Sequence, residues 1–364
     1  MPSTVRFLRQ FLFRRESAVV REETTYRRGG RELPATLYHP GGSTLPGWVA
    51  LHGLTHRGRA HESLEAIARA LAASGAAVLV PDIPEWRALH VAPETAVETI
   101  QAAVLDLDGR PFTAPGRTGV IGFSFGGTHA LVAATEPALE GHLAAVTSWG
   151  GYADLRRTLR FAFLGDHELD GEAHHLDPDP YGRWIFAGNY LTGIPEHRGD
   201  GALAAALLRL AREVGRRKLM AWEPATNPLK EEARSSLDGR QQEFFDLIAP
   251  PTDASRTPVE RARLDTLADR LAQAALEQDP VLDPAPYLAR VPVPVFLAHG
   301  RDDRLMPWTE LIRLRRALPA ARIRHAVVTG LFAHSFRERR LPTPSMVMEA
   351  ARFVRAIHRM VHLV

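Results

Sequence analysis

The stretch that decides the fold is VIGFSFGGTHA, residues 120–130, in which an apolar run ends at a serine enclosed by glycines. Glycine weakens the interior of a regular strand or helix. Its repeated use around Ser124 therefore indicates a local backbone conformation that needs residues without a Cβ. The pattern G-x-S-x-G runs from Gly122 to Gly126.

This pattern lies between a predicted strand, 117–123, and a predicted helix, 124–136, which is the context that a nucleophile elbow requires. In such an elbow a strained turn lifts the serine hydroxyl out at the head of the helix. There, free N–H groups and the helix dipole can stabilise a developing oxyanion. We interpret Ser124 as a nucleophile; the alternative is a glycine-rich turn with a purely structural role.

On both sides of the elbow, strands and helices alternate with short links, which is typical of a parallel sheet covered on both faces. A hairpin is expected at 18–39, with its turn at Gly29-Gly30. Counting every segment gives an α/β fold with about eight strands. The further predicted strands are 47–53, 76–82, 143–151, 291–300 and 322–329, and the helices are 60–74, 93–108, 307–318 and 342–361.

Residues 155–290 follow a different pattern, because they contain no convincing strand and several segments of helical periodicity, such as 201–218 and 257–278. Ligands of open α/β sheets bind at the carboxyl edge of the strands. We therefore predict a mostly helical cap insertion at 155–290, covering that edge and excluding water. Residues 1–154 and 291–364 then form the core.

A serine hydroxyl is a weak nucleophile and needs a base. His334 is the candidate, because it follows a predicted strand that ends near Thr329. Asp302 and Asp303 follow the strand 291–298 and supply an orienting carboxylate, in the chain order serine, acid, histidine. Asp154, after strand 143–151, is the alternative acid, and its other interpretation is the N-cap of the next helix.

With these residues in place, the chain resembles the α/β-hydrolases, and in detail their dienelactone-hydrolase and carboxylesterase-like branch. The match covers the predicted core and is specific for fold and triad. Four segments carry it: ALHGLTHRG at 50–58, GFSFGG at 122–127, AHGRDDRLMP at 298–307 and GLFAHSF at 330–336.

The resemblance implies roles for particular residues. In the family pattern H-G-x-x-D-x-x-V-P the acid corresponds to Asp303, with Met306 in place of valine, and Asp302 is then expected to cap the turn. The base corresponds to His334. Together with Ser124 these residues would form the catalytic triad.

The same resemblance gives the backbone N–H groups of Leu54 and Phe125 as the oxyanion donors, and His52 as a residue that fixes the oxyanion loop. Dienelactone hydrolases carry cysteine at the elbow, whereas this chain has no cysteine at all. The departure favours ordinary ester chemistry.

The sequence thus predicts a serine hydrolase that cleaves a carboxylic ester of a small molecule through an acyl-enzyme. A hydrolase-like small-molecule binding protein and an acyltransferase with the same triad are the alternatives. Trp149, Tyr152 and Trp184, with His52, are tentative pocket residues, and their other interpretation is core packing.

No cofactor is expected. The segment 165–180 gathers three histidines and several acids, but it lacks the spacing of a metal site, so we predict a turn-rich solvated loop and no metal. The net charge is only +3 over 364 residues, and the basic residues do not cluster in the sequence. Both observations argue against a nucleic-acid partner.

The N-terminal residues 5–15 have the pattern of a basic amphipathic helix. One interpretation is weak contact with a membrane surface, and the other is a helix docked on the protein itself. No apolar run is long enough to span a membrane, and the N-terminus is a poor signal peptide, so a cytoplasmic location is expected.

Overall fold

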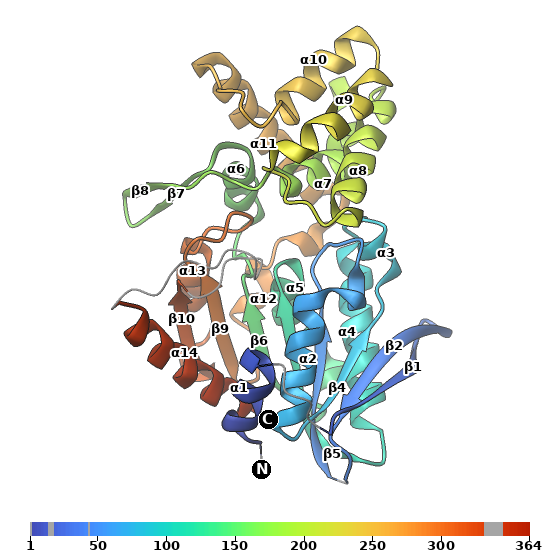
Figure 1. Ribbon diagram of the computed structural model, residues 1–364, viewed down its shortest axis with the longest axis vertical. Helices are drawn as coiled ribbons and strands as arrows, with labels where there is room; N and C mark the ends of the chain where they lie inside the picture. The colour runs from blue at the N-terminus through green and yellow to red at the C-terminus, as the bar shows by residue number, and fades with distance from the viewer. Residues whose placement is uncertain (1, 14–17, 43, 331–344) are drawn as a thin grey trace.

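A sheet of eight strands forms the centre of the computed structural model, which describes residues 2–13, 18–42, 44–330 and 345–364. The strand order is β1-β2-β4-β3-β5-β6-β9-β10; β1–β2 and β2–β4 pair antiparallel and the other neighbours pair parallel (Figure 1). The predicted mostly parallel sheet is thereby confirmed. The strands are β1 (Val20–Arg28), β2 (Arg31–His39), β3 (Leu45–Leu51), β4 (Ala77–Pro81), β5 (Thr113–Phe123), β6 (Leu143–Trp149), β9 (Val295–Gly300) and β10 (Ile323–Thr329).

The central strands are apolar throughout because both faces of the sheet are buried. Alternate residues of a strand point to opposite faces. In β3, Val49 and Leu51 therefore join one hydrophobic core, while Trp48 and Ala50 join the other. A short apolar run without polar alternation is the pattern expected of such a strand.

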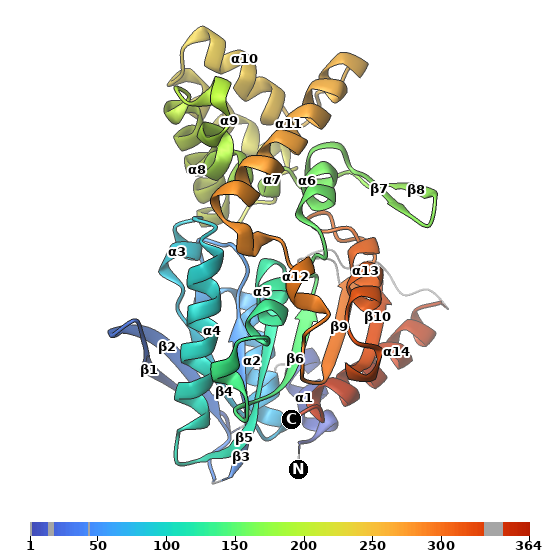
Figure 2. The ribbon, with the colours of Figure 1, turned by 180° about the vertical axis from the view of Figure 1, so that it is seen from behind.

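Helices cover the two faces in separate sets. One face carries α1 (Thr4–Phe13), α2 (Glu62–Ser74) and α14 (Ser345–Val361), seen in front in Figure 1. The other carries α4 (Pro93–Asp108), α5 (Phe125–Ala133), α12 (Ala285–Leu288) and α13 (Thr309–Ala317), seen in front in Figure 2; the short α3 (Pro84–Arg87) precedes α4. The predicted helices on both faces are confirmed.

The N-terminal helix α1 is docked on the body of the protein. Phe7 is buried in the core formed with α2 and α14, and Leu8 and Phe11 pack against that core. Leu12 and Phe13 are exposed. The docked-helix interpretation is confirmed, and contact of this helix with a membrane surface stays a prediction. Among the described residues no helix combines the length and apolarity needed to cross a bilayer.

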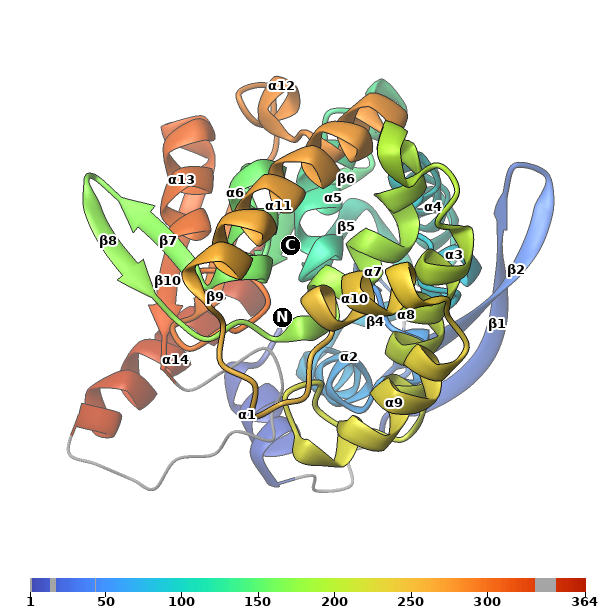
Figure 3. The same ribbon diagram turned by 90° about the horizontal axis from the view of Figure 1, so that it is seen from above.

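The segment 155–290 is mostly helical, as predicted, and its helices gather beyond the carboxyl ends of the strands (Figures 1 and 3). Several of them begin at an aspartate whose side chain accepts a hydrogen bond from the first turn, as at Asp154, Asp179 and Asp238. The helices are α6 (Leu155–Leu164), α7 (Pro180–Tyr190), α8 (Gly201–Arg216), α9 (Asn227–Ser235), α10 (Gly239–Ile248) and α11 (Pro258–Gln278).

The prediction that this segment holds no strand is wrong. Residues expected to form a loop make a hairpin of β7 (Asp166–Leu169) and β8 (Glu172–His175). Its two-residue turn, Asp170-Gly171, has φ of 56° and 83°. Asp-Gly with both φ positive is the sequence preference of a two-residue hairpin turn, and this local signal could have revealed the hairpin.

Candidate active site

Ser124 has the backbone conformation of an elbow. It connects β5 to α5 with φ 55° and ψ −126°, a region that residues other than glycine seldom occupy. Strain of this kind persists only where the surrounding structure enforces it, and it concentrates at functional sites. The strained turn that the sequence predicts at Ser124 is therefore present.

The glycines around Ser124 are required because the backbone is packed against itself. A Cβ on Gly122 would lie 2.1 Å from the carbonyl oxygen of Gly126, and one on Gly126 would lie 2.8 Å from the carbonyl oxygen of His52. Neither backbone oxygen can move as the end of a flexible side chain could. The G-x-S-x-G spacing thus allows β5, α5 and the loop after β3 to approach one another.

We expect Gly122→Ala to destabilise the protein by about 3 kcal/mol, because the methyl group would displace backbone of α5. The measurement is the midpoint of urea unfolding, which reports stability when the dependence of the unfolding free energy on urea concentration is unchanged. Gly239→Ala, at the first residue of α10 with no atom within 4 Å of the added methyl, is the matched control and should be neutral or stabilising. Equal midpoints for Gly122→Ala and the wild-type protein would contradict this account of the turn.

The carboxyl ends of four neighbouring strands are joined by backbone hydrogen bonds. Ser124 N–H donates to the Trp149 carbonyl at 2.7 Å, and Gly150 N–H donates to the Ala298 carbonyl at 2.8 Å. Beyond them, Arg301 N–H donates to Thr329 at 2.9 Å. These bonds hold the carboxyl ends of β5, β6, β9 and β10 together at one edge of the sheet, the edge that carries Ser124 and the Asp303 turn.

Asp303 lies in a buried turn after β9. Its Oδ1 accepts hydrogen bonds from the backbone N–H groups of Leu305 at 2.9 Å and Met306 at 3.0 Å. Asp303 thus caps this turn itself, and the capping role expected of Asp302 stays a prediction. Because β6 separates β5 from β9, the strand ends that carry Ser124 and Asp303 are about 10 Å apart.

His299, which the sequence analysis did not select, stabilises that turn by a hydrogen bond to its backbone. Its Nε2 is 3.0 Å from the carbonyl oxygen of Met306, which can only accept, so Nε2 carries the proton and donates it. The same nitrogen is 3.6 Å from Asp303 Oδ2. The predicted base, His334, lies outside the described residues.

Phe125 directly follows Ser124, and Gly53, just before Leu54, approaches the elbow closely: a Cβ on Gly53 would lie 3.2 Å from Ser124 Cβ. Phe125 is the first residue of α5, so its N–H has no partner within the helix. Across the described chain, neither Phe125 N–H nor Leu54 N–H donates a hydrogen bond to another group. Their role as oxyanion donors stays a prediction.

His52 holds the loop that carries Leu54. Its Nδ1 lies 2.7 Å from the Gly53 carbonyl oxygen, so Nδ1 donates, and complete burial lowers the pKa of the imidazole to about 4. A neutral ring bonded to its own loop suits the predicted fixing role and not proton transfer near neutral pH.

Solved structures are similar to this chain over most of its length. Acylaminoacyl peptidase of Pyrococcus horikoshii matches 95% of this chain and 42% of its own, with 14% identity and a TM-score of 0.51. A hypothetical protein of Pseudomonas aeruginosa matches 93% of this chain and 94% of its own, with 18% identity and a TM-score of 0.50. This chain has the α/β-hydrolase fold.

A provisionally named dienelactone hydrolase of Klebsiella pneumoniae matches 94% of this chain and 99% of its own, with 14% identity and a TM-score of 0.46. Comparison with protein-family models and with curated proteins finds no match. The predicted α/β-hydrolase fold is confirmed, and the finer placement in the dienelactone-hydrolase and carboxylesterase-like branch stays a prediction.

Asp154, the alternative acid of this α/β-hydrolase fold, has a structural role. Its side chain caps α6 by accepting from Arg157 N–H at 2.9 Å, and it forms an ion pair with the Arg157 side chain at 3.3 Å. The N-cap interpretation of this residue is therefore confirmed.

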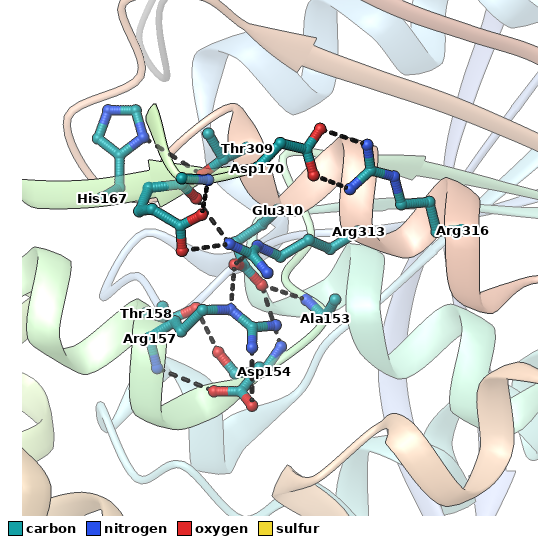
Figure 4. A network of polar contacts seen from close by, with 12 residues as sticks. Ala153, Asp154, Arg157, Thr158, His167, Asp170, Thr309, Glu310, Arg313 and Arg316 are labelled. Atoms are coloured by element: carbon teal, nitrogen blue, oxygen red, sulfur yellow. Dashed lines mark hydrogen bonds and ion pairs between the residues drawn. The ribbon is translucent and has the colours of Figure 1, made fainter. Parts of the chain in front are cut away.

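A buried carboxylate, that of Glu310 on α13, holds the loop after β6 in place. The sequence analysis did not identify this residue. It accepts from the backbone N–H groups of Ala153 at 2.9 Å and Asp154 at 3.0 Å, and from Arg157 Nε at 3.0 Å (Figure 4). Burial raises the pKa of Glu310, and the Arg157 guanidinium opposes that rise. The sequence held one sign of this role: Glu310 stands beside Leu311, among the residues that form the buried face of α13.

The hairpin β7–β8 is fixed to α13 beside this carboxylate. Asp170 makes a two-bond ion pair with Arg316, with both distances 2.7 Å, and His167 Nδ1 lies 3.2 Å from Thr309 Oγ1 (Figure 4). Among the described residues no group of histidines and carboxylates is arranged to hold a metal ion. A cavity of about 420 Å³ separates the hairpin from the turn that carries Asp303, and it is lined by His167, His174, His175, Arg301, Asp302 and Trp308, with Ala173 and Leu176.

The three tentative aromatic pocket residues differ in position. Trp149 is half-buried beside the elbow, where its carbonyl binds Ser124 N–H. Tyr152 is buried against Phe125, and its hydroxyl donates to the Leu282 carbonyl at 2.9 Å. Trp184 is buried in α7, in agreement with the core-packing interpretation.

Two buried histidines near the elbow make stability depend on pH. Burial lowers the pKa values of His52 and His129 to about 4, from 6.5. The unfolded chain therefore binds their protons first, and stability falls as pH decreases from 6.5 towards 4, by roughly 3 kcal/mol for each histidine. Above pH 6.5 their effect is constant.

His129→Leu should reduce this loss by about half, since one of the two titrating groups is removed. The measurement is the urea unfolding free energy as a function of pH. His90→Leu, at an exposed histidine, is the control and should leave the slope unchanged. A slope that His129→Leu does not alter would contradict the lowered pKa, because it would show that the histidine binds its proton equally in the folded and unfolded states.

Proposed function

We propose that this protein is a serine hydrolase that cleaves a carboxylic ester of a small molecule through an acyl-enzyme. The observation that carries the proposal is Ser124 at positive φ between β5 and α5, with free N–H groups of Phe125 and Leu54 beside it. Free donors at a helix N-terminus stabilise the charge of a tetrahedral intermediate. Acylaminoacyl peptidase, a similar structure, is by its name a hydrolase of an acyl bond, which agrees with the proposal.

In the proposed reaction Ser124 Oγ attacks the ester carbonyl carbon while His334 takes its proton. Asp303 orients the imidazole and stabilises the imidazolium, and the two backbone N–H groups bind the oxyanion. His334 then gives the proton to the leaving alcohol. Water, activated by the same histidine, releases the acid and restores the serine.

We further propose that the helices of 155–290 act as the cap that selects the substrate. They lie beyond the carboxyl ends of the strands, where ligands of this kind of sheet bind (Figures 1 and 2). The cavity lined by Arg301 and Asp302 adjoins the Asp303 turn, and its volume of about 420 Å³ suits a small molecule.

The test is covalent labelling by a fluorophosphonate probe, followed by peptide mapping of the modified residue. We expect modification of Ser124 in the folded protein and turnover of p-nitrophenyl esters graded in acyl length. Labelling without release of acid would favour an acyltransferase, which added alcohols would reveal by ester exchange. Folded protein that is not labelled but binds small molecules would instead favour a hydrolase-like binding protein.

A further inference from the structure

A second cavity of about 420 Å³ lies within the helical segment, among α9, α10 and the residues that follow α10. In Figure 1 these helices stand at the end of the molecule remote from the sheet. Its wall includes two cations, Lys230 and Arg256, an apolar surface of Phe245, Ala249 and Pro250, and the acidic residues Glu231, Asp246 and Glu260. Nothing in the proposed ester reaction uses this cavity.

Two cations, Lys230 and Arg256, line this cavity, and Arg183 lies close enough for its charge to act on Lys230. Lys230 Nζ donates to the Pro250 carbonyl at 2.8 Å, and Arg183 Nε donates to the Ile248 carbonyl at 2.7 Å. The Arg256 Nη2 group is buried and has no hydrogen-bond partner in the described part of the chain. None of the three side chains forms an ion pair with a described carboxylate.

Because these cations are buried, leaving their charges unpaired raises the free energy of the folded protein. Lys230 and Arg183 are 5% and 9% exposed. Burial, followed by the charge of Arg183, lowers the pKa of Lys230 to about 8; burial, followed by the charge of Arg256, lowers the pKa of Arg183 to about 9. Burial also lowers the pKa of Arg256. An unpaired buried charge is unfavourable unless a counter-charge binds beside it.

The carboxylates in the cavity wall are engaged elsewhere or lie at its surface. Asp246 accepts from Arg234 Nε through both oxygens, at 2.9 and 3.0 Å. Glu260 is bonded to the N–H and hydroxyl of Thr257, where it completes a capping box. Glu231 is exposed. The charges of Glu260, Asp253 and Asp179 act through space on Arg256, Lys230 and Arg183 respectively, but none of them forms an ion pair with these cations among the described residues.

We infer that this cavity binds a small organic carboxylate, whose anionic group is held by Lys230 and Arg256. Arg183, one helix behind, adds to the positive potential. The rest of the ligand would contact the apolar wall formed by Phe245, Ala249 and Pro250. That wall favours an organic acid over inorganic phosphate, and the volume is within the usual range of small-molecule sites. The inference does not depend on the role of Ser124.

The chain offers an internal reporter, because its two lysines are Lys218 and Lys230. Lys218 is exposed and paired with Glu62 at 2.9 Å. In protein labelled with carbon-13 at lysine Cε, titration with hexanoate should shift the Lys230 signal saturably and leave that of Lys218 in place. Since the anion favours the charged ammonium, the pKa of Lys230 should rise from about 8 by about one unit at saturation.

The same titration with acetate, inorganic phosphate and chloride at matched ionic strength distinguishes a site for an organic acid from one for any anion. Hexanoate should bind at least about tenfold more tightly than acetate, because acetate lacks the apolar part. Arg256→Gln should weaken hexanoate binding about tenfold, while Arg217→Gln, at an exposed residue, should not. Preference for phosphate, equal shifts of both lysines, or no saturable shift in the wild-type protein would each overturn the assignment.

Discussion

Ser124→Ala is expected to lower kcat/KM for p-nitrophenyl esters by about 10⁴- to 10⁶-fold and to abolish fluorophosphonate labelling, because the attacking oxygen is removed. Alanine carries a Cβ as serine does, so the strain at φ 55° is unchanged and the fold should persist. The measurements are steady-state kinetics and labelling, with the urea midpoint as the control for folding.

The result that would contradict the proposed nucleophile is specific. If the folded Ser124→Ala protein kept more than about one hundredth of the turnover, another group would be attacking the ester. Peptide mapping of the residual labelled protein would then identify that group.

Asp303→Asn should lower kcat/KM by about 10⁴-fold, because an uncharged amide neither stabilises the imidazolium nor selects its productive tautomer. The turn itself should survive. Asparagine retains a carbonyl oxygen that can accept from Leu305 and Met306 as Oδ1 does now. The loss should therefore appear in kcat, with little change in the urea midpoint.

Asp154→Asn is the matched control for this substitution. Asparagine is as good an N-cap as aspartate, and the ion pair with Arg157 is half-exposed, so activity and stability should change little. A larger loss of activity in Asp154→Asn than in Asp303→Asn would reverse the assignment of the acid.

Much of the fold was predictable because its signals are local. The Gly29-Gly30 turn and the G-x-S-x-G elbow each follow from the φ values or close backbone contacts that only glycine permits. The hairpin β7–β8 had an equally local signal in Asp-Gly, and it was missed because the many charges around it resemble a solvated loop.

The site was predictable in part for the same reason. Ser124 and the Asp303 turn each follow the end of an apolar strand, so their edge of the sheet could be inferred from the chain order. The residues that hold these two turns in place could not be inferred in this way. His299 and Glu310 are buried polar residues within apolar elements, and no periodicity indicates which backbone groups they bind.

The sequence by itself determined the alternating strands and helices, the glycine-lined elbow and the helical character of 155–290. These properties arise from backbone sterics and from burial periodicities that span a few residues. Tertiary structure alone decided that Glu310 holds the loop at Ala153, and that the charges of Arg183, Lys230 and Arg256 lie close enough to interact. Those groups are tens to more than a hundred residues apart in the chain. Their charges interact through space once folding removes water, and no local pattern encodes that distance.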